Sequence, residues 1–458
     1  MAEPGPSAQQ RPPWSVIGAP IWHRRIWAVA LPIMIANATT PLLGIVDTAV
    51  VGHLGDPVYI GAVGAGGVLF SLVFWGFGFL RMGTTGLIAQ ARGADDRDRL
   101  RTVLGQAGLL ALLLGLLLIA VSQPLRELAL SLIDVSDSVA DEARGYFEMR
   151  ILGAPATLLN YVLMGWFLGI NRAGLVLATQ LFLNLTNIAL SILFVVGFGW
   201  GVPGVAIASA VAEYLALILG LVLVARSLSL LGGHLRWRQV FDSRTIKRLL
   251  AVNLDIFIRT LCLQAAFLWF TSVGGSLGNL VLAANVVLLQ FHTLNAFILD
   301  GYAFACETLI GDRVGAGDRR GLRQAVRAGT FWAALTAVVL AGLFWLAGDL
   351  IIALMTDLET VRAAAGSYLP WAVALPIVSV WSYLLDGIFV GATRTAAMRN
   401  SMIVSLIGFV ALQQVFTPIW GNDGLWLSML GFMALRAVTL GSAYPALLQT
   451  VSRRCQTA

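Results

Sequence analysis

The sequence predicts an all-α polytopic membrane protein with twelve transmembrane helices, arranged in two six-helix lobes related by a parallel internal repeat. Of its 458 residues, 58% are hydrophobic and only 12% are charged, whereas soluble proteins carry about 25% charged residues. So few charges cannot cover a water-facing surface, and so high an apolar content excludes a disordered chain. The other two observations are the number of long apolar stretches and a repeat between the two halves.

The apolar stretches are each long enough for the roughly 20 residues that a helix needs to cross a bilayer. The apolar stretch after Arg24 and Arg25 is too long for a signal-peptide core, so it is interpreted as a retained first span. The twelve predicted spans are roughly 27–52, 58–89, 102–122, 147–170, 174–197, 203–225, 249–274, 281–310, 328–348, 366–391, 400–420 and 424–450.

The basic residues predict the orientation, because cytoplasmic loops carry an excess of arginine and lysine. Alternate loops hold most of the 30 basic residues, whereas the intervening loops are acidic, with Glu127, Asp141 and Glu359 among them. We therefore expect both termini in the cytoplasm, and we interpret the basic runs as topology signals rather than nucleic-acid contacts. The predicted parts are a cytoplasmic N-terminal tail (1–25), an N-lobe (26–226), a cytoplasmic linker (227–248), a C-lobe (249–450) and a C-terminal tail (451–458).

The internal repeat has a period of about 222 residues. The segment GADDRDRLRTVLGQA (93–107) matches GAGDRRGLRQAVRAG (315–329), and GWFLGINRA (165–173) matches GIFVGATRT (387–395). Six spans per half is an even number, so both halves start on the same side of the membrane and the repeats are parallel. Parallel repeats around a site near the midplane are typical of transporters that work by rocking of two lobes.

Ionisable residues inside spans are costly to bury, so each is a candidate for function. In the N-lobe, Asp47 lies near the outer end of the first span, and Ser191 and Ser209 lie at similar depths on the fifth and sixth spans. Asn187 and Glu213 lie one turn deeper, each four residues from the serine on its helix, and such pairs share a face. These five residues are predicted to form one cation-coupling cluster.

Two chemistries fit that cluster. A carboxylate withdrawn from water can exchange a proton near neutral pH, and the same oxygen ligands could instead hold Na⁺. The alternative is that Asp47 and Glu213 only bind neighbouring helices through hydrogen bonds. Pro32 and Pro41 lie in the first span, where each favours a kink, and they are predicted to form either a gate beside Asp47 or a static bend.

In the C-lobe, the candidates for substrate or second-cation binding are Asp300, Glu307, Asp386 and His292. Asp300 and Glu307 share a face of the eighth span, and Arg313 is a candidate partner for Glu307. Asp255 and Arg259 are four residues apart and are expected to neutralise each other. His292 is either a relay residue or a packed histidine.

No cofactor or metal is predicted besides the coupling ion. The three cysteines (Cys262, Cys306 and Cys455) form no CxxC pair, and the four histidines show no zinc spacing. No HExxH, GxGD or serine–histidine arrangement indicates an enzyme.

The sequence resembles the MATE (multidrug and toxic compound extrusion) family, and within it the DinF subfamily. The segments that carry the resemblance are LPIMIANATTPLLGIVDTAVVGHLGDPVYIGAVG (31–64), FLRMGTTGLIAQARG (79–93), NLDIFIRTLCLQAAF (253–267) and LAANVVLLQFHTLNAFILDGYAFACETLIGDRVGAGDRR (282–320). The resemblance covers about residues 25–450 and implies twelve helices in two lobes around a V-shaped cavity. It also implies export of cationic or amphipathic compounds in exchange for H⁺ or Na⁺.

The resemblance extends to particular residues of the N-lobe. The family's first-span aspartate matches Asp47, and its sixth-span hydroxyl matches Ser209. The family often has an asparagine followed four residues later by an aspartate on the fifth span, but here Asn187 is followed by Ser191. The missing carboxylate halves the negative charge of such a Na⁺ site, although Glu213 could restore it one turn deeper. We therefore favour H⁺ over Na⁺ as the coupling ion.

The expected function is multidrug efflux by cation antiport, with Asp47 as the coupling carboxylate and alternating access between the lobes. The substrates are expected to be organic cations or amphipathic drugs, and the protein a monomer in a bacterial inner membrane. The alternative is a flippase for lipids or lipid-linked oligosaccharides. A flippase usually has a basic cavity, whereas the spans here hold more acids than arginines.

Overall fold

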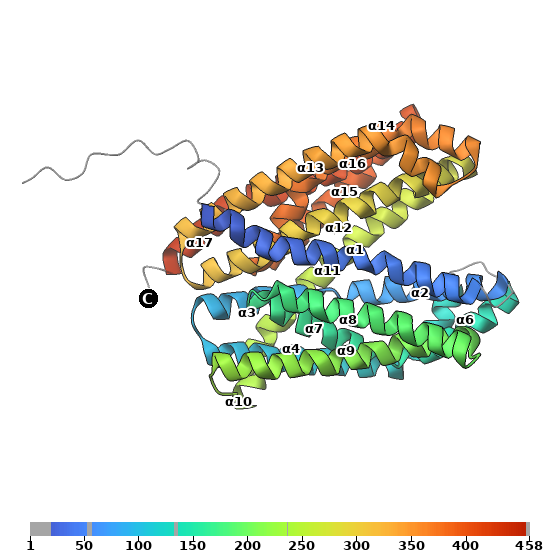
Figure 1. The fold of residues 1–458 in the computed structure, drawn as a ribbon. Coiled ribbons are helices and arrows are strands. Elements are labelled where there is room, and N and C mark those ends of the chain that lie inside the picture. The colour runs from blue at the N-terminus through green and yellow to red at the C-terminus, as the bar shows by residue number, and fades with distance from the viewer. Residues whose placement is uncertain (1–19, 53–56, 132–135, 236, 455–458) are drawn as a thin grey trace, which may run out of the picture.

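Two helical bundles lie side by side in the computed structural model, which describes residues 20–52, 57–131, 136–235 and 237–454 (Figure 1). Within these residues it is all-α, with no strand. Eleven segments are long and apolar enough to cross a membrane, and there are twelve if the pair that meets at 53° counts as one bent span. These twelve segments coincide with the twelve predicted spans, so the predicted fold class is confirmed. His53, Cys455 and most of the predicted N-terminal tail lie outside the described residues.

The first bundle, which we call the N-lobe, contains nine α-helices and one short π-helical segment among the described residues. They are α1 (Pro20–Gly52), α2 (Pro57–Gly76), α3 (Phe79–Gly93), α4 (Arg97–Ala120), α5 (Ser122–Ser131), α6 (Asp137–Ile151), α7 (Ala154–Gly169), α8 (Ala173–Ile192), the π-helical Leu193–Gly197 and α9 (Gly201–Leu231). Helices α2 and α3 share the second span, and α6 and α7 form the bent fourth span.

The second bundle, the C-lobe, follows the short helix α10 (Trp237–Val240). It consists of α11 (Ser243–Ser276), α12 (Asn279–Gly315), α13 (Arg319–Met355), α14 (Glu359–Gly391), α15 (Thr395–Trp420), α16 (Asn422–Ser442) and α17 (Tyr444–Arg454). Helices α9 and α11 extend well into the segment predicted as linker. Apolar stretches mark only the part of a helix inside the hydrocarbon, whereas the helix itself continues until a cap or a glycine ends it.

The internal repeat is visible in the backbone. Three connections of the N-lobe contain a residue with positive φ, and each recurs at the matching place in the C-lobe. The pairs are Asp95 and Gly317 (φ 51° and 69°), Asn171 and Thr393 (60° and 50°), and Gly199 and Gly421 (69° and 58°). The helix caps recur too, since Asp96 accepts from the amide of Arg99 at 3.0 Å and Asp318 from that of Gly321 at 2.8 Å.

The lobes are in close contact at one end, which we call the terminal end because α1 begins there and α17 lies there (Figure 1). The contact is reciprocal across the repeat. A Cβ atom on Gly93 of α3 would lie 1.9 Å from the carbonyl oxygen of Asp312 on α12, and one on Gly315 of α12 would lie 2.1 Å from that of Gln90 on α3. Only glycine permits such an approach. Gln90 also donates to the carbonyl of Gly391 at 3.0 Å.

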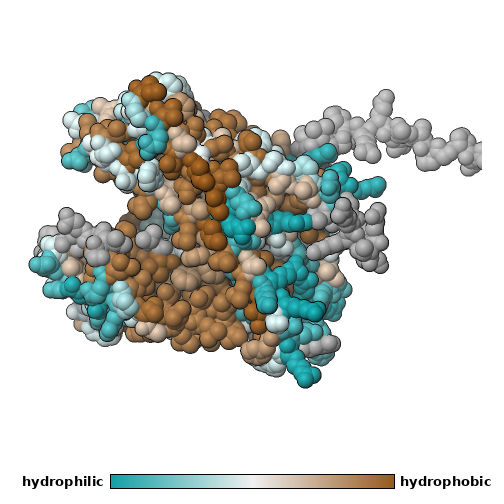
Figure 2. Space-filling model, turned by 180° about the vertical axis from the view of Figure 1, so that it is seen from behind, coloured by the Kyte–Doolittle hydropathy of each residue, from teal (hydrophilic) through white to brown (hydrophobic). Residues whose placement is uncertain are grey.

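The opposite end is open. The molecular surface is hollowed between the two lobes there (Figure 2). The polar contacts that join the lobes in the described part of the chain lie toward the terminal end or near the middle of the helices, such as Trp22 to Gln324 (2.8 Å) and Asn37 to the carbonyl of Phe297 (3.1 Å). The structure therefore has a V shape that is closed at the terminal end.

Helix α1 belongs to both lobes. Its first turns pack on the C-lobe, where Trp22 is bonded to α13, and its last turns pack on α8 of the N-lobe. Pro32 and Pro41 lie between these two contacts, and α1 is helical through both of them. A proline removes one backbone hydrogen bond, so the two prolines weaken α1 between its two attachments.

Candidate functional site

The N-lobe brings four of the five predicted coupling residues into one chain of hydrogen bonds. Ser191 of α8 lies 3.1 Å from Oδ1 of Asp47 on α1 and 3.3 Å from Oδ1 of Asn187 on its own helix. Asn187 in turn donates to Ser209 of α9 at 2.8 Å. All four side chains are buried. The chain connects three helices and ends in a buried carboxylate that can bind a small cation.

Glu213, the fifth predicted residue, lies one turn along α9 from Ser209 but is not bonded to this chain. Its Oε2 accepts a hydrogen bond from Asn160 of α7 at 2.8 Å, and its Oε1 lies 3.7 Å from Nη2 of Arg150. Glu213 therefore adds negative charge to the same region of the N-lobe, without a hydrogen bond to Asp47 among the described residues.

Arg150 is the functional candidate that sequence reasoning missed. It lies at the end of α6, just before the 53° bend to α7, and its side chain reaches into the N-lobe, where it interacts with both Asp47 and Glu213. The boundary of the predicted fourth span placed Arg150 near an outer loop. The nearby Gly153 and Pro155 were the signal that could have indicated a bend there.

A second contact joins α1 to α8 closer to the middle of the helices. Asn184 donates to Thr39 at 2.8 Å and accepts from Gln180 at 3.1 Å. Helix α1 is thus attached to α8 at two levels, and Pro41 lies between them.

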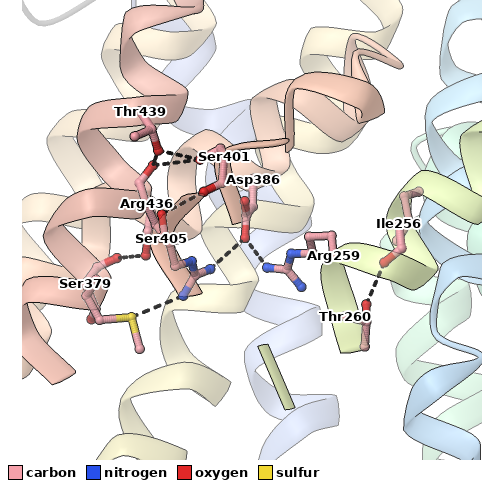
Figure 3. Close-up of polar contacts among 11 residues, drawn as sticks. Ile256, Arg259, Thr260, Ser379, Asp386, Ser401, Ser405, Arg436 and Thr439 are labelled. Carbon is pink, nitrogen blue, oxygen red and sulfur yellow. Dashed lines mark hydrogen bonds and ion pairs between the residues drawn. The ribbon is translucent and has the colours of Figure 1, made fainter. Parts of the chain in front are cut away.

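In the C-lobe, two arginines converge on one carboxylate (Figure 3). Asp386 of α14 accepts from Arg436 of α16 at 2.9 Å and also pairs with Arg259 of α11. Arg436 is only 3% exposed. Two guanidinium groups already neutralise Asp386, which leaves little negative charge there for a cationic substrate.

The expected pairing of Asp255 with Arg259 is wrong. Asp255 instead accepts from Arg399 at 2.6 Å and from Thr395 at 2.9 Å, both on α15. The spacing of four residues places Asp255 and Arg259 on one face of α11. Helix α11 is also in contact with α14, α15 and α16, and those helices offer each of the two side chains another partner. Interhelical contacts decide the pairing here.

Glu307 does not pair with Arg313 either. It forms a buried ion pair with Arg81 of α3 at 3.2 Å, across the boundary between the lobes, and the guanidinium of Arg81 lies 3.8 Å from the ring centre of Phe304. Arg313 pairs with Asp312 and with Asp318. The Arg81–Glu307 ion pair therefore links the N-lobe to the C-lobe.

Asp300 and His292 occupy the rest of the C-lobe site. Within the described part of the chain, Asp300 has no hydrogen bond or ion pair, although it lies within electrostatic range of Arg81, Arg259 and Arg436. His292 packs with its ring centre 4.9 Å from that of Phe267, and its buried Nδ1 has no partner there. The His292 ring is therefore packed against an aromatic side chain, but its Nδ1 lacks the hydrogen-bond partner that a buried polar atom usually has.

The two lobes differ in charge. The N-lobe region holds two carboxylates, Asp47 and Glu213, and one guanidinium, Arg150. The C-lobe region balances Asp300 and Asp386 with Arg259 and Arg436. An excess negative charge attracts a cation, and of these two regions only the N-lobe one has such an excess.

The C-lobe network makes one prediction about stability. In Asp386→Asn, Arg259 and Arg436 face each other without their counter-charge, and removing one partner of a buried ion pair costs about 3–5 kcal/mol. We expect a clearly lower melting temperature for the purified protein. Asp357→Asn is the matched control, because Asp357 is exposed in its 3.0 Å pair with Arg362 and such pairs contribute about 0–1 kcal/mol. Equal melting temperatures for the two variants would contradict the structural role of Asp386.

No cluster of three or more metal-ligating side chains occurs among the residues that the structure describes. Cys262 and Cys306 are free thiols.

Two repeated lobes of six spans each that form a V, with buried carboxylates inside both of them, define a bilobed membrane transporter. The MatE family model matches residues 32–193 in the N-lobe and 256–419 in the C-lobe. The chain therefore belongs to the MatE family, and it is a multi-pass transporter rather than an enzyme. The predicted resemblance is confirmed.

Individual relatives agree with this assignment. The chain is 42% identical to the DNA damage-inducible protein F of Escherichia coli over 426 residues, which cover 92% of each chain. It is 28% identical to a probable multidrug resistance protein NorM of Pseudomonas aeruginosa, over 92% of this chain and 88% of that one. A solved structure described as the outward-facing conformation of a multidrug resistance MATE family transporter has the same fold, with a TM-score of 0.84 at 19% identity, covering 97% of this chain and 100% of that one.

Proposed function

We propose that this transporter exports organic cations and amphipathic drugs in exchange for protons, with Asp47 as the coupling carboxylate. The observation that carries the proposal is the buried chain from Asp47 through Ser191 and Asn187 to Ser209. This chain joins three helices of the lobe that has the excess negative charge. Ser191 has one hydroxyl hydrogen but lies beside two acceptor oxygens, those of Asp47 and Asn187. A proton on Asp47 could be donated to Ser191, whose own hydrogen would then serve Asn187.

Sodium is the second candidate for the coupling ion, because the same oxygens could replace part of its water shell. The single carboxylate in the chain favours a proton. In either case the ion neutralises Asp47 in one conformation and leaves it charged in the other, which couples ion binding to the exchange between the two conformations.

The closed terminal end fits alternating access. If both termini lie in the cytoplasm, as the basic loops predict, the structure is open to the outside and closed to the cytoplasm. The lobes would then rock about α1, α3 and α12 to open the other side. We propose a monomer that works in this way in the bacterial inner membrane, in contact with lipid and with no nucleic-acid partner.

A flippase is not favoured. Two of the bacterial relatives, both of Pseudomonas aeruginosa, are named as a probable multidrug resistance protein NorM and as the multidrug resistance protein PmpM. The N-lobe carries excess negative charge, which would repel an anionic headgroup.

Transport by purified protein in liposomes tests the proposal. The liposomes are loaded with a fluorescent organic cation, and either a pH gradient or a Na⁺ gradient is imposed alone. We expect dye movement under the pH gradient and none above background under the Na⁺ gradient. Movement under Na⁺ alone would assign coupling to Na⁺, and movement under neither gradient would overturn the assignment to cation antiport.

A further inference from the structure

Arg150 occupies a site in the N-lobe that is built like a cage for a cation. Its guanidinium carbon lies 5.7 Å from the ring centre of Phe70 and 5.8 Å from that of Phe74, both on α2. Glu213 of α9 faces it at 3.7 Å. Aromatic faces beside a carboxylate are the features that bind organic cations. In this protein, the cation between these groups is the guanidinium of Arg150 itself.

The backbone makes room for this side chain. Arg150 is the second-last residue of α6, and the 53° bend to α7 follows at once. A Cβ atom on Gly153 would lie 3.0 Å from Nη1 of Arg150 and 3.1 Å from the Cα atom of Ala210 on α9. A larger residue at position 153 would have to displace either the guanidinium or α9. The absence of a side chain there therefore helps to direct Arg150 into the lobe.

The guanidinium of Arg150 bonds to Tyr146 on its own helix, but its contact with Glu213 is a long-range ion pair. Its Nη1 is buried without a partner in the described part of the chain, and the 3.7 Å between Nη2 and Glu213 exceeds hydrogen-bond length. Arg436 in the C-lobe differs, because it donates to Asp386 at 2.9 Å. Glu213 is therefore paired less tightly with Arg150 than Asp386 is with Arg436, which leaves more of its negative charge available to a second cation.

We propose that Arg150 is a tethered cation that fills the acidic site of the N-lobe and thereby limits which free cations the site admits. The other groups that face it are Asp47, Tyr146 and Tyr161, on α1, α6 and α7. Two carboxylates and one resident guanidinium leave room for one further positive charge. This inference rests on the proposed function, because it concerns the selectivity of the same site.

The consequence is a gain of cation binding when the charge of Arg150 is removed. In Arg150→Gln, the guanidinium no longer offsets the negative charge of Asp47 and Glu213. The rings of Phe70 and Phe74 then become available to a ligand. We expect tetraphenylphosphonium to bind the purified full-length protein at least about tenfold more tightly than wild type. We also expect Na⁺ to raise the melting temperature of Arg150→Gln but not that of the wild type.

Two variants separate charge from shape. Arg150→Lys keeps the positive charge and is expected to bind tetraphenylphosphonium as weakly as wild type. Arg144→Gln is the matched control, because Arg144 lies on the same helix and is more exposed, in a 2.5 Å pair with Asp141; we expect wild-type binding. If Arg150→Gln binds no more tightly than wild type, or if Arg150→Lys behaves like Arg150→Gln, the inference is overturned.

A second pair of variants applies if Arg150→Gln does not fold. Glu213→Gln removes the carboxylate that faces Arg150, and the double variant Arg150→Gln/Glu213→Gln removes both charges. We expect the double variant to bind tetraphenylphosphonium about tenfold more tightly than Glu213→Gln, and equal binding would contradict the proposal. These binding measurements need no ion gradient. The proposed function is tested separately, by transport of the wild-type protein in liposomes.

Discussion

In Asp47→Asn, pH-driven transport of an organic cation is expected to fall to the level of liposomes without protein. The amide has nearly the same size as the carboxyl group and can still accept the hydrogen bond from Ser191, which lies 3.1 Å from Oδ1. The variant should therefore fold and insert, because only one charge-assisted hydrogen bond is weakened, at a cost of about 1–3 kcal/mol. What it loses is the ability to bind and release a proton, without which the gradient cannot drive export.

The measurement is dye movement in liposomes under an imposed pH gradient, together with gel filtration and the melting temperature of each purified protein. Asp357→Asn provides the control, because it is the same substitution at an exposed side chain. It should transport as wild type does. Full activity in Asp47→Asn would show that the coupling group lies elsewhere, and the C-lobe carboxylate Asp300 would then be the next to test.

The second large effect is expected at the contact between α3 and α12. In Gly93→Ala, the added Cβ atom would lie 1.9 Å from the backbone oxygen of Asp312, so the terminal end cannot close as it does here. Overpacking of this kind costs about 1–3 kcal/mol, which shifts a two-state balance roughly 5- to 150-fold. We expect the protein to favour the state that is open at the terminal end, and transport to fall by a similar factor.

The reciprocal contact gives an internal check. Gly315→Ala should have the same effect, because its Cβ atom would lie 2.1 Å from the carbonyl oxygen of Gln90. Gly108→Ala is the control, since nothing lies within 4 Å of a Cβ atom at that position of α4. The readout is the distance between spin labels at positions 97 and 320, on the two lobes, in a protein whose native cysteines are replaced by serine. An unchanged distance and wild-type transport in Gly93→Ala would rule out a role for this contact in closing the terminal end.

The sequence by itself determined the membrane spans, the repeat and the residues of the N-lobe network. Spans and repeat are local properties, because hydropathy over about 20 residues and a fixed period require no knowledge of neighbours. The network could be predicted because Asn187 and Ser191 share one helix face, as Ser209 and Glu213 do. Counting residues from the span ends gives the depth of Asp47, Ser191 and Ser209. The bond between Ser191 and Asp47 agrees with their equal predicted depths. Ser209 instead meets Asn187, which was predicted one turn deeper.

Only the tertiary structure decided which charges pair. Asp255 meets Arg399 instead of Arg259, and Asp386 is shared by Arg259 and Arg436. Glu307 meets Arg81 of the other lobe, and the bend between α6 and α7 turns Arg150 inward toward Glu213. In hydrocarbon a buried charge pairs with whichever opposite charge the packed helices bring within reach. The rotation of each helix and the identity of its neighbours set that choice, and neither is encoded in the hydropathy of a single segment.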